Sequence, residues 1–215
     1  MIVYWILLLI TALFAYLFGS MDTMVLASNF VFRRNLLRLG DQSTWLSNFR
    51  RLFGWGGFAK LLVVEVIKDV IPILIGSVLL GIKGHADAGR AFAGFVLVLG
   101  RLWPAFYRFR GSSAFVAMTV AAFTAAGSVG AAVMVVTAAA IIATRYISLG
   151  TVLGAVVYVM VAVLAVDDAL LLRLALLTAA LVFVRHIPAV IRLFRRTEPR
   201  MSYEKDITYK LDEKF

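Results

Sequence analysis

Charged side chains inside an apolar run are the first candidates for chemistry in this sequence. Lys60, Glu65, Lys68 and Asp69 lie in or beside a run that is otherwise apolar. Spacings of three and four residues place the last three of them on one face of a helix. Ionisable groups within a membrane face the interior of a helix bundle, where a transporter or a proton path could use them. The alternative, which we favour, is that Glu65 and Lys68 neutralise each other and brace the bundle.

Metal ligands are scarce in this chain. The sequence contains no Cys, and its two histidines are His85 and His186. The lack of Cys excludes disulfides and thiolate metal sites. Two histidines are also too few to predict a His-based metal site, so we expect no bound metal.

The overall composition is that of a membrane protein. Hydrophobic residues make up 62% of the chain and charged residues 16%, and the mean hydropathy is +0.94. A soluble domain of 215 residues could not bury so much apolar surface. We therefore expect an all-α integral membrane protein, in which residues 1–196 form one polytopic membrane domain and residues 197–215 form a charged cytoplasmic tail.

The apolar runs predict seven transmembrane helices, some of them short. They cover Ile2–Phe18, Phe58–Leu80, Ala91–Trp103, the two halves of Phe115–Ala143, Ser148–Val166 and Ala169–Val184. The run from Phe115 to Ala143 is too long for one comfortable span, and small residues around Gly127 predict a break in its middle. An odd number of spans places the two termini on opposite faces of the membrane.

Most of the positive charge lies in alternate connections between these runs. Of the 22 Lys and Arg residues, 18 fall in residues 30–60 and 101–110, at Arg145, and in the chain from Arg185 onward. Membrane proteins keep Lys and Arg in their cytoplasmic loops. We therefore expect the N-terminus outside and the C-terminus in the cytoplasm. The same bias explains the net charge of +10 without a nucleic-acid partner, because the basic residues are divided among loops that carry no nucleic-acid-binding motif.

Several motifs in the expected cytoplasmic connections follow a known order. The first two are Ala15–Ser20, which reads A-Y-L-F-G-S, and Gly40–Asn48 followed by Arg51 and Gly54. The third runs from Gly100 through Pro104, Phe106, Phe109 and Gly111 to Ser113. The last two are Arg145–Leu149, which reads R-Y-I-S-L, and Arg185-His186 followed by Arg192. This ordered set resembles the bacterial PlsY family of acyl-phosphate:glycerol-3-phosphate acyltransferases, with its motifs A-Y-L-x-G-S, R-Y-x-S-L and R-H-R-E-N-x-x-R.

The resemblance implies an enzyme of phospholipid synthesis in the bacterial cytoplasmic (inner) membrane, in contact with membrane lipids. Such an enzyme transfers a fatty acyl group from acyl phosphate to the 1-hydroxyl of glycerol 3-phosphate and forms lysophosphatidic acid, without a metal or any other cofactor. It also implies substrate-binding roles at the positions that match the family motifs. These positions are Ser47, Asn48, Arg51, Arg110, Ser113, Arg145, Ser148 and His186. For Arg51, the other interpretation is a charge that only contacts lipid headgroups.

The chain departs from the family motifs at several positions. Gln42, Trp45 and Leu46 stand where the family has Gly, Gly and Ala, Ser113 stands for a Lys, and Pro188 and Ala189 stand for a Glu and an Asn. Cβ atoms obstruct the backbone turns that direct N–H groups at a phosphate. Arg101 and Arg108 are added cations that could take the place of the missing Lys. A second hypothesis therefore stays open: a catalytically silent relative that binds lipid or serves as a subunit beside another membrane protein.

Overall fold

The computed structural model describes residues 2–30, 45–109, 111, 113–198, 200 and 201, and for residues 27–30 and 45–53 it describes the backbone alone. The regular elements in these ranges are all helices, as the composition predicted. The α-helices are α1 (Ile2–Ser20), α2 (Thr23–Phe30), α3 (Trp45–Gly81), α4 (Ala86–Leu102), α5 (Phe115–Ala125), α6 (Gly127–Thr144), α7 (Ile147–Ala165) and α8 (Ala169–Phe194). A 3-10 helix, Ala105–Tyr107, lies between α4 and α5.

The outer surface of the bundle is built for contact with lipid. In the described ranges, α1, α6, α7 and α8 are long and apolar enough to cross a membrane. Large apolar side chains point outward from them, with Leu164 and Phe194 each 85% exposed. A water-soluble protein would not expose so much contiguous apolar surface. The chain is an all-α integral membrane protein, whereas the count of seven spans and the orientation stay predictions.

The helix boundaries confirm the expected break in the longest apolar run. Helix α5 ends at Ala125 and α6 begins at Gly127, because Ala126 is extended with φ −163° and ψ 151°. Two features were not predicted. Helix α2 follows α1 directly, and α3 begins at Trp45 rather than at Phe58, with a kink at Gly54. Gly54 takes φ 69° and ψ −173°, a conformation that a residue with a side chain rarely adopts.

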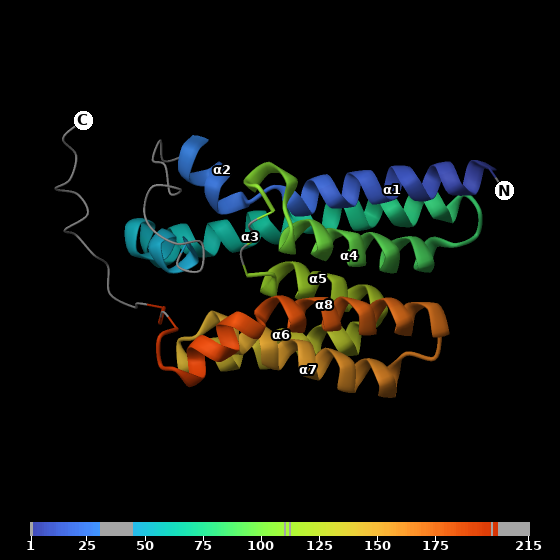
Figure 1. The fold of residues 1–215 in the computed structure, drawn as a ribbon. Coiled ribbons are helices and arrows are strands. Elements are labelled where there is room, and N and C mark those ends of the chain that lie inside the picture. Colours follow the sequence, from blue (N-terminus) through green and yellow to red (C-terminus); the bar gives the residue numbers. More distant parts are fainter. Residues whose placement is uncertain (1, 31–44, 110, 112, 199, 202–215) are drawn as a thin grey trace.

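Two groups of helices form the bundle (Figure 1). Helices α1, α3 and α4 pack side by side, and α6, α7 and α8 form the second group. Helix α5 lies between the groups and contacts α4, α6 and α8. The buried core continues through both groups, since Leu97 of α4, Met118 of α5 and Tyr158 of α7 are each almost fully buried in it.

Close contact between α1 and α4 depends on two glycines. A Cβ atom at Gly19 would overlap the carbonyl group of Leu97, and one at Gly100 would overlap the carbonyl oxygen of Tyr16. Small residues allow membrane helices to approach to backbone contact. This contact brings the end of α1 beside the end of α4, and so places Asp22 next to Arg101.

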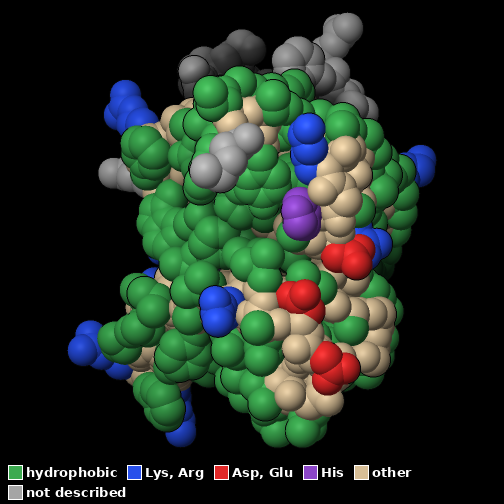
Figure 2. Space-filling view, turned by 90° about the vertical axis from the view of Figure 1, so that its right-hand side faces the viewer, with side chains coloured by type: hydrophobic (Ala, Val, Ile, Leu, Met, Phe, Trp, Pro, Cys, Tyr) green, Lys and Arg blue, Asp and Glu red, His purple; other side chains and the backbone are tan. Residues whose placement is uncertain are grey.

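The connections lie at two opposite ends of the bundle. The start of α1 and the α3–α4 and α7–α8 connections share one end, and the α4–α5 and α6–α7 connections share the other with the end of α8 (Figure 1). On the first end, acidic and basic side chains lie among hydrophobic ones (Figure 2). The second end carries the cationic motifs that the sequence assigns to the cytoplasm.

Candidate active site

A cavity of about 190 Å³ opens at the end of the bundle where α4, α7 and α8 carry their motif residues. Helices α2, α3, α5, α7 and α8 contribute to its wall, together with the end of α4 and the chain that follows it. Its polar side chains include Arg101, Ser113, Ser148, Arg185, His186 and Arg192. The Glu65 carboxylate and apolar side chains, several of them from α3 and α5, complete the wall, so the cavity combines charged and hydroxyl groups with an apolar side.

Three of the eight predicted substrate-binding residues meet in this cavity. Ser113, Ser148 and His186 all line it, although up to 73 positions of sequence separate them. Arg145 does not: it is exposed at the end of α6, where its backbone takes φ 64° and its carbonyl oxygen accepts a hydrogen bond from the backbone N–H of Met201. The cavity lining therefore does not include Arg145, and its substrate-binding role stays a prediction.

The side chains of the other four predicted residues are not among those that the structure describes. Ser47, Asn48 and Arg51 belong to the first part of α3, where the structure describes the backbone alone. Arg110 lies outside the described residues. Their substrate-binding roles stay predictions.

Arg185 is the cavity cation that best fits an anionic ligand. Its Nε and Nη2 atoms donate to the carbonyl oxygens of Leu102 and Gly111, each at 3.4 Å. Among the described residues, no carboxylate pairs with Arg185. The neutral carbonyl groups orient the guanidinium but leave its charge uncompensated, which favours the binding of a phosphate group beside it.

His186 and the two serines supply the remaining polar groups. The Nδ1 atom of His186 lies 2.7 Å from the carbonyl oxygen of Val182, which can only accept, so Nδ1 carries a proton. When the ring is neutral, its Nε2 atom is therefore an acceptor. Ser113 shares a hydrogen bond of 3.0 Å with Thr151, and Ser148 donates to the carboxylate of Glu198.

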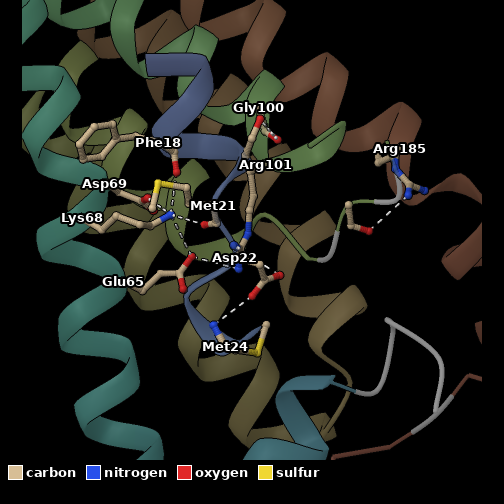
Figure 3. Close-up of polar contacts among 12 residues, drawn as sticks. Phe18, Met21, Asp22, Met24, Glu65, Lys68, Asp69, Gly100, Arg101 and Arg185 are labelled. Atoms are coloured by element: carbon tan, nitrogen blue, oxygen red, sulfur yellow. Dashed lines mark hydrogen bonds and ion pairs between the residues drawn. The ribbon is translucent and has the colours of Figure 1, made fainter. Parts of the chain in front are cut away.

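Five charged side chains form a network (Figure 3), and two of them, Glu65 and Arg101, line the cavity. The Arg101 guanidinium lies 3.0 Å from Glu65 and 3.6 Å from Asp22. The Lys68 Nζ atom lies 2.9 Å from Asp69 and 3.7 Å from Glu65, and it also donates to two carbonyl oxygens at the end of α1. The predicted pair of Glu65 and Lys68 is confirmed as part of this network, which joins α1, α3 and α4.

This network changes the interpretation of two residues. Arg101 was a candidate to replace the missing Lys of the family motif, but two carboxylates already balance its charge. Arg108, the other candidate, is exposed and does not line the cavity. The burial of Glu65 and Asp69, at 3% and 0% exposure, also argues against a water-filled transport path through α3.

The chain after α4 is held against α1 by polar contacts. Tyr16 donates to the carbonyl oxygen of Trp103 at 2.8 Å, and the backbone N–H of Ala105 donates to the hydroxyl of Ser20 at 3.4 Å.

In the same part of the chain, burial and the nearby Asp22 carboxylate raise the pKa of the Tyr107 phenol above its usual value. Tyr107 therefore stays protonated and neutral at physiological pH.

Four residues of this region had no role predicted from the sequence. Arg185 and Arg192 stand in a motif that the sequence displays, so their places in the cavity wall could have been proposed. Asp22 and Glu198 carried no such signal. Both are buried, at 4% and 7% exposure. Asp22 pairs with Arg101 of α4, and Glu198 pairs with Arg192 of α8.

Comparisons with known proteins agree with the fold and with the motifs. A family model described as glycerol-3-phosphate acyltransferase matches residues 9–196. Glycerol-3-phosphate acyltransferase of Thermoanaerobacter pseudethanolicus is 26% identical over 198 residues, which cover 92% of this chain and 98% of that protein. The protein of the same name from Prochlorococcus marinus is 29% identical, with coverage of 90% and 98%.

Two crystal structures of PlsY (YgiH), an integral membrane glycerol 3-phosphate acyltransferase, share the fold. The glycerol 3-phosphate form matches with a TM-score of 0.75 and 22% identity, over 96% of this chain and 99% of that one. The lysophosphatidic acid form matches with a TM-score of 0.71 and 23% identity, over 91% and 96%. With the family model matching most of its length, this chain belongs to the glycerol-3-phosphate acyltransferase family.

Proposed function

We propose that this protein is a membrane acyltransferase that moves a fatty acyl group from acyl phosphate to glycerol 3-phosphate and forms lysophosphatidic acid. The observation that carries the proposal is the meeting of Arg185, Ser148 and His186 in one cavity of a chain from this family. A cation that no carboxylate of the described residues pairs with, a hydroxyl and an imidazole are the groups that a small phosphate-bearing alcohol needs.

Arg185 would hold a phosphate group. Its guanidinium donates to two carbonyl oxygens, and its side chain lines the cavity. A charge-assisted contact of this kind contributes about 1.5–3 kcal/mol to binding. The phosphate of glycerol 3-phosphate and that of acyl phosphate are both suitable partners.

His186 is the candidate acceptor for the proton of the attacking hydroxyl. In the reaction, the hydroxyl oxygen of glycerol 3-phosphate forms a bond to the acyl carbonyl carbon, and the bond from that carbon to the phosphate oxygen breaks. The hydroxyl proton must leave during this step, and inorganic phosphate departs. With Nδ1 bound to Val182, a neutral His186 offers Nε2 for that proton.

An apolar pocket of about 300 Å³ next to the cavity supports a lipid substrate. Val116 lines the cavity and Val120 lines the pocket, one helical turn further along α5. On α3, Glu65 lines the cavity and the adjacent Val66 lines the pocket. An acyl chain whose phosphate end lies near Arg185 could therefore extend between α3 and α5.

The cellular setting follows from the same proposal. The relatives compared above are bacterial proteins, and phospholipid synthesis requires contact with the membrane, so the bacterial cytoplasmic membrane is the expected location. The cavity would then face the cytoplasm, because it lies at the end of the bundle that carries the cationic motifs.

A turnover assay tests the proposal. The full chain, purified in detergent, is given acyl phosphate and glycerol 3-phosphate, and inorganic phosphate and lysophosphatidic acid are measured. We expect both products to appear at equal rates, well above a protein-free control. Failure to form lysophosphatidic acid would favour the other hypothesis, a silent subunit or lipid-binding relative, for which the described residues offer no specific support.

A further inference from the structure

Glu198 lies behind two side chains of the cavity wall without lining the cavity itself. It contacts Ser148 and Arg192, which do line it. We propose that Glu198 is a positioning residue that makes Ser148 a hydrogen-bond acceptor and thereby selects a phosphate ligand that also carries a hydroxyl group. The inference rests on the proposed function for the identity of the ligand, and it assigns the two ends of that ligand to different groups.

Glu198 is held in place by the short segment that follows α8. Its side chain is only 2% exposed. Beyond it, the Nε atom of Arg200 donates to the phenol of Tyr146 at 2.7 Å, and the backbone N–H of Met201 donates to the carbonyl oxygen of Arg145 at 2.8 Å. These contacts fasten the segment to the connection between α6 and α7, next to Ser148 in the first turn of α7.

Both oxygens of the Glu198 carboxylate are used. Oε2 accepts from Nε of Arg192 at 2.7 Å, and Oε1 accepts from the hydroxyl of Ser148. A carboxylate paired with an arginine has no proton to give, so Ser148 must be the donor in their hydrogen bond. A hydroxyl has one proton, and here that proton points away from the cavity.

Ser148 is therefore left with lone pairs for a ligand. A phosphate oxygen can only accept, so it forms no hydrogen bond with the Ser148 oxygen. An alcohol O–H of the ligand, by contrast, can donate to the Ser148 oxygen. Arg185, without a carboxylate partner in the described chain, is the group suited to the phosphate. The two groups together recognise a phosphorylated alcohol, with Ser148 on the hydroxyl and Arg185 on the phosphate.

Equilibrium binding to the purified full chain tests this assignment with two ligands. Glycerol 3-phosphate carries hydroxyl groups, and n-propyl phosphate has the same length without them. The wild type should bind glycerol 3-phosphate about tenfold more tightly, because a hydroxyl-reading site rejects the analogue that leaves its polar groups unpaired. The ratio of the two dissociation constants should fall towards one in Ser148→Ala.

Glu198→Gln should reduce the same ratio. The amide oxygen of Gln would accept from Arg192, and its NH2 group would donate to Ser148. Ser148 would then accept in this hydrogen bond, and its O–H would be free to point into the cavity. Affinity for n-propyl phosphate should persist in both variants, which shows that they fold and keep the phosphate site. Asp87→Asn is the matched control: it removes one carboxylate from the exposed pair with Arg90 and should leave the ratio unchanged.

Three results would overturn the inference: a wild type that binds both ligands equally, a Glu198→Gln variant with the wild-type ratio, or one that binds both ligands more tightly by the same factor. The last would make Glu198 a competing anion. The proposed function is judged separately, because a protein without acyl transfer could still show the predicted ratios, and an active enzyme could lack them.

Discussion

The Nη2 atom of Arg101 lies 3.0 Å from the Oε1 atom of Glu65, and both side chains are almost fully buried. Glu65 and Arg101 also line the cavity, so the network that joins α1, α3 and α4 forms part of the cavity wall. Removing a member of such a network leaves uncompensated charge in a medium of low polarity. The stability of the bundle and the shape of the cavity are therefore linked at this pair.

Arg101→Met should destabilise the fold strongly. The substitution removes the cation that lies beside the buried Asp22 carboxylate and leaves Glu65 with Lys68 alone, and breaking a buried pair costs about 3–5 kcal/mol. Thermal unfolding in detergent should show a much lower midpoint. Arg90→Met breaks an exposed pair with Asp87 and should cost about 1 kcal/mol or less. Equal losses in the two variants would contradict a structural role for the network.

Gly100→Ala should weaken the contact between α1 and α4. The added methyl group would overlap the carbonyl oxygen of Tyr16, and overpacking of this kind costs about 1–3 kcal/mol. Gly127→Ala is the control, because a Cβ atom there meets nothing within 4 Å. Unfolding midpoints should fall for the first variant alone, and a stable Gly100→Ala protein would show that the helices are not in backbone contact.

His186→Gln should reduce the rate of acyl transfer more than the affinity for glycerol 3-phosphate. Loss of a general base lowers kcat by about 10²–10⁴-fold. His85→Gln changes an exposed histidine at the other end of the bundle and should have the activity of the wild type. Steady-state kinetics decide between the outcomes: an unchanged kcat with a raised KM would make His186 a binding residue only.

Val120→Trp should change the acyl-chain preference. Its side chain would fill the apolar pocket between α3 and α5, so long-chain acyl phosphates should lose kcat/KM while short-chain ones keep it. Val135→Trp places the same bulk on the lipid-facing side of α6, where Val135 is 61% exposed. A chain-length profile that stays the same in Val120→Trp would remove the pocket from the acyl path.

Local sequence patterns predicted most of the helices. The break near Gly127 followed from the length of its apolar run and from its small residues, and the structure has it at Ala126. The end of α8 was not foreseen, because the chain becomes cationic after Val184 while the helix continues to Phe194. Charged residues do not end a helix, so hydropathy marks the apolar part of α8 rather than its boundary.

The candidate site was only partly predictable, because its contacts are distant in sequence. Ser113, Ser148 and His186 could be proposed from motifs, whereas the two carboxylates that pair with Arg101 could not. Asp22 reaches Arg101 only because glycines bring α1 against α4. Arg145 stands in a motif with Ser148, but the structure places it exposed at the end of α6, outside the cavity wall, so motif membership alone does not tell which side chains meet.

We propose that glycerol 3-phosphate binds and reacts in the cavity beside Arg185, and two arginines of α8 allow a matched test of this site. Arg185→Ala and Arg173→Ala each remove an arginine from this helix, the first at the cavity and the second at an exposed position near the opposite end. The KM for glycerol 3-phosphate in acyl transfer should rise at least about tenfold in Arg185→Ala and stay near the wild-type value in Arg173→Ala. An Arg185→Ala enzyme with wild-type KM and kcat would show that glycerol 3-phosphate does not bind beside Arg185.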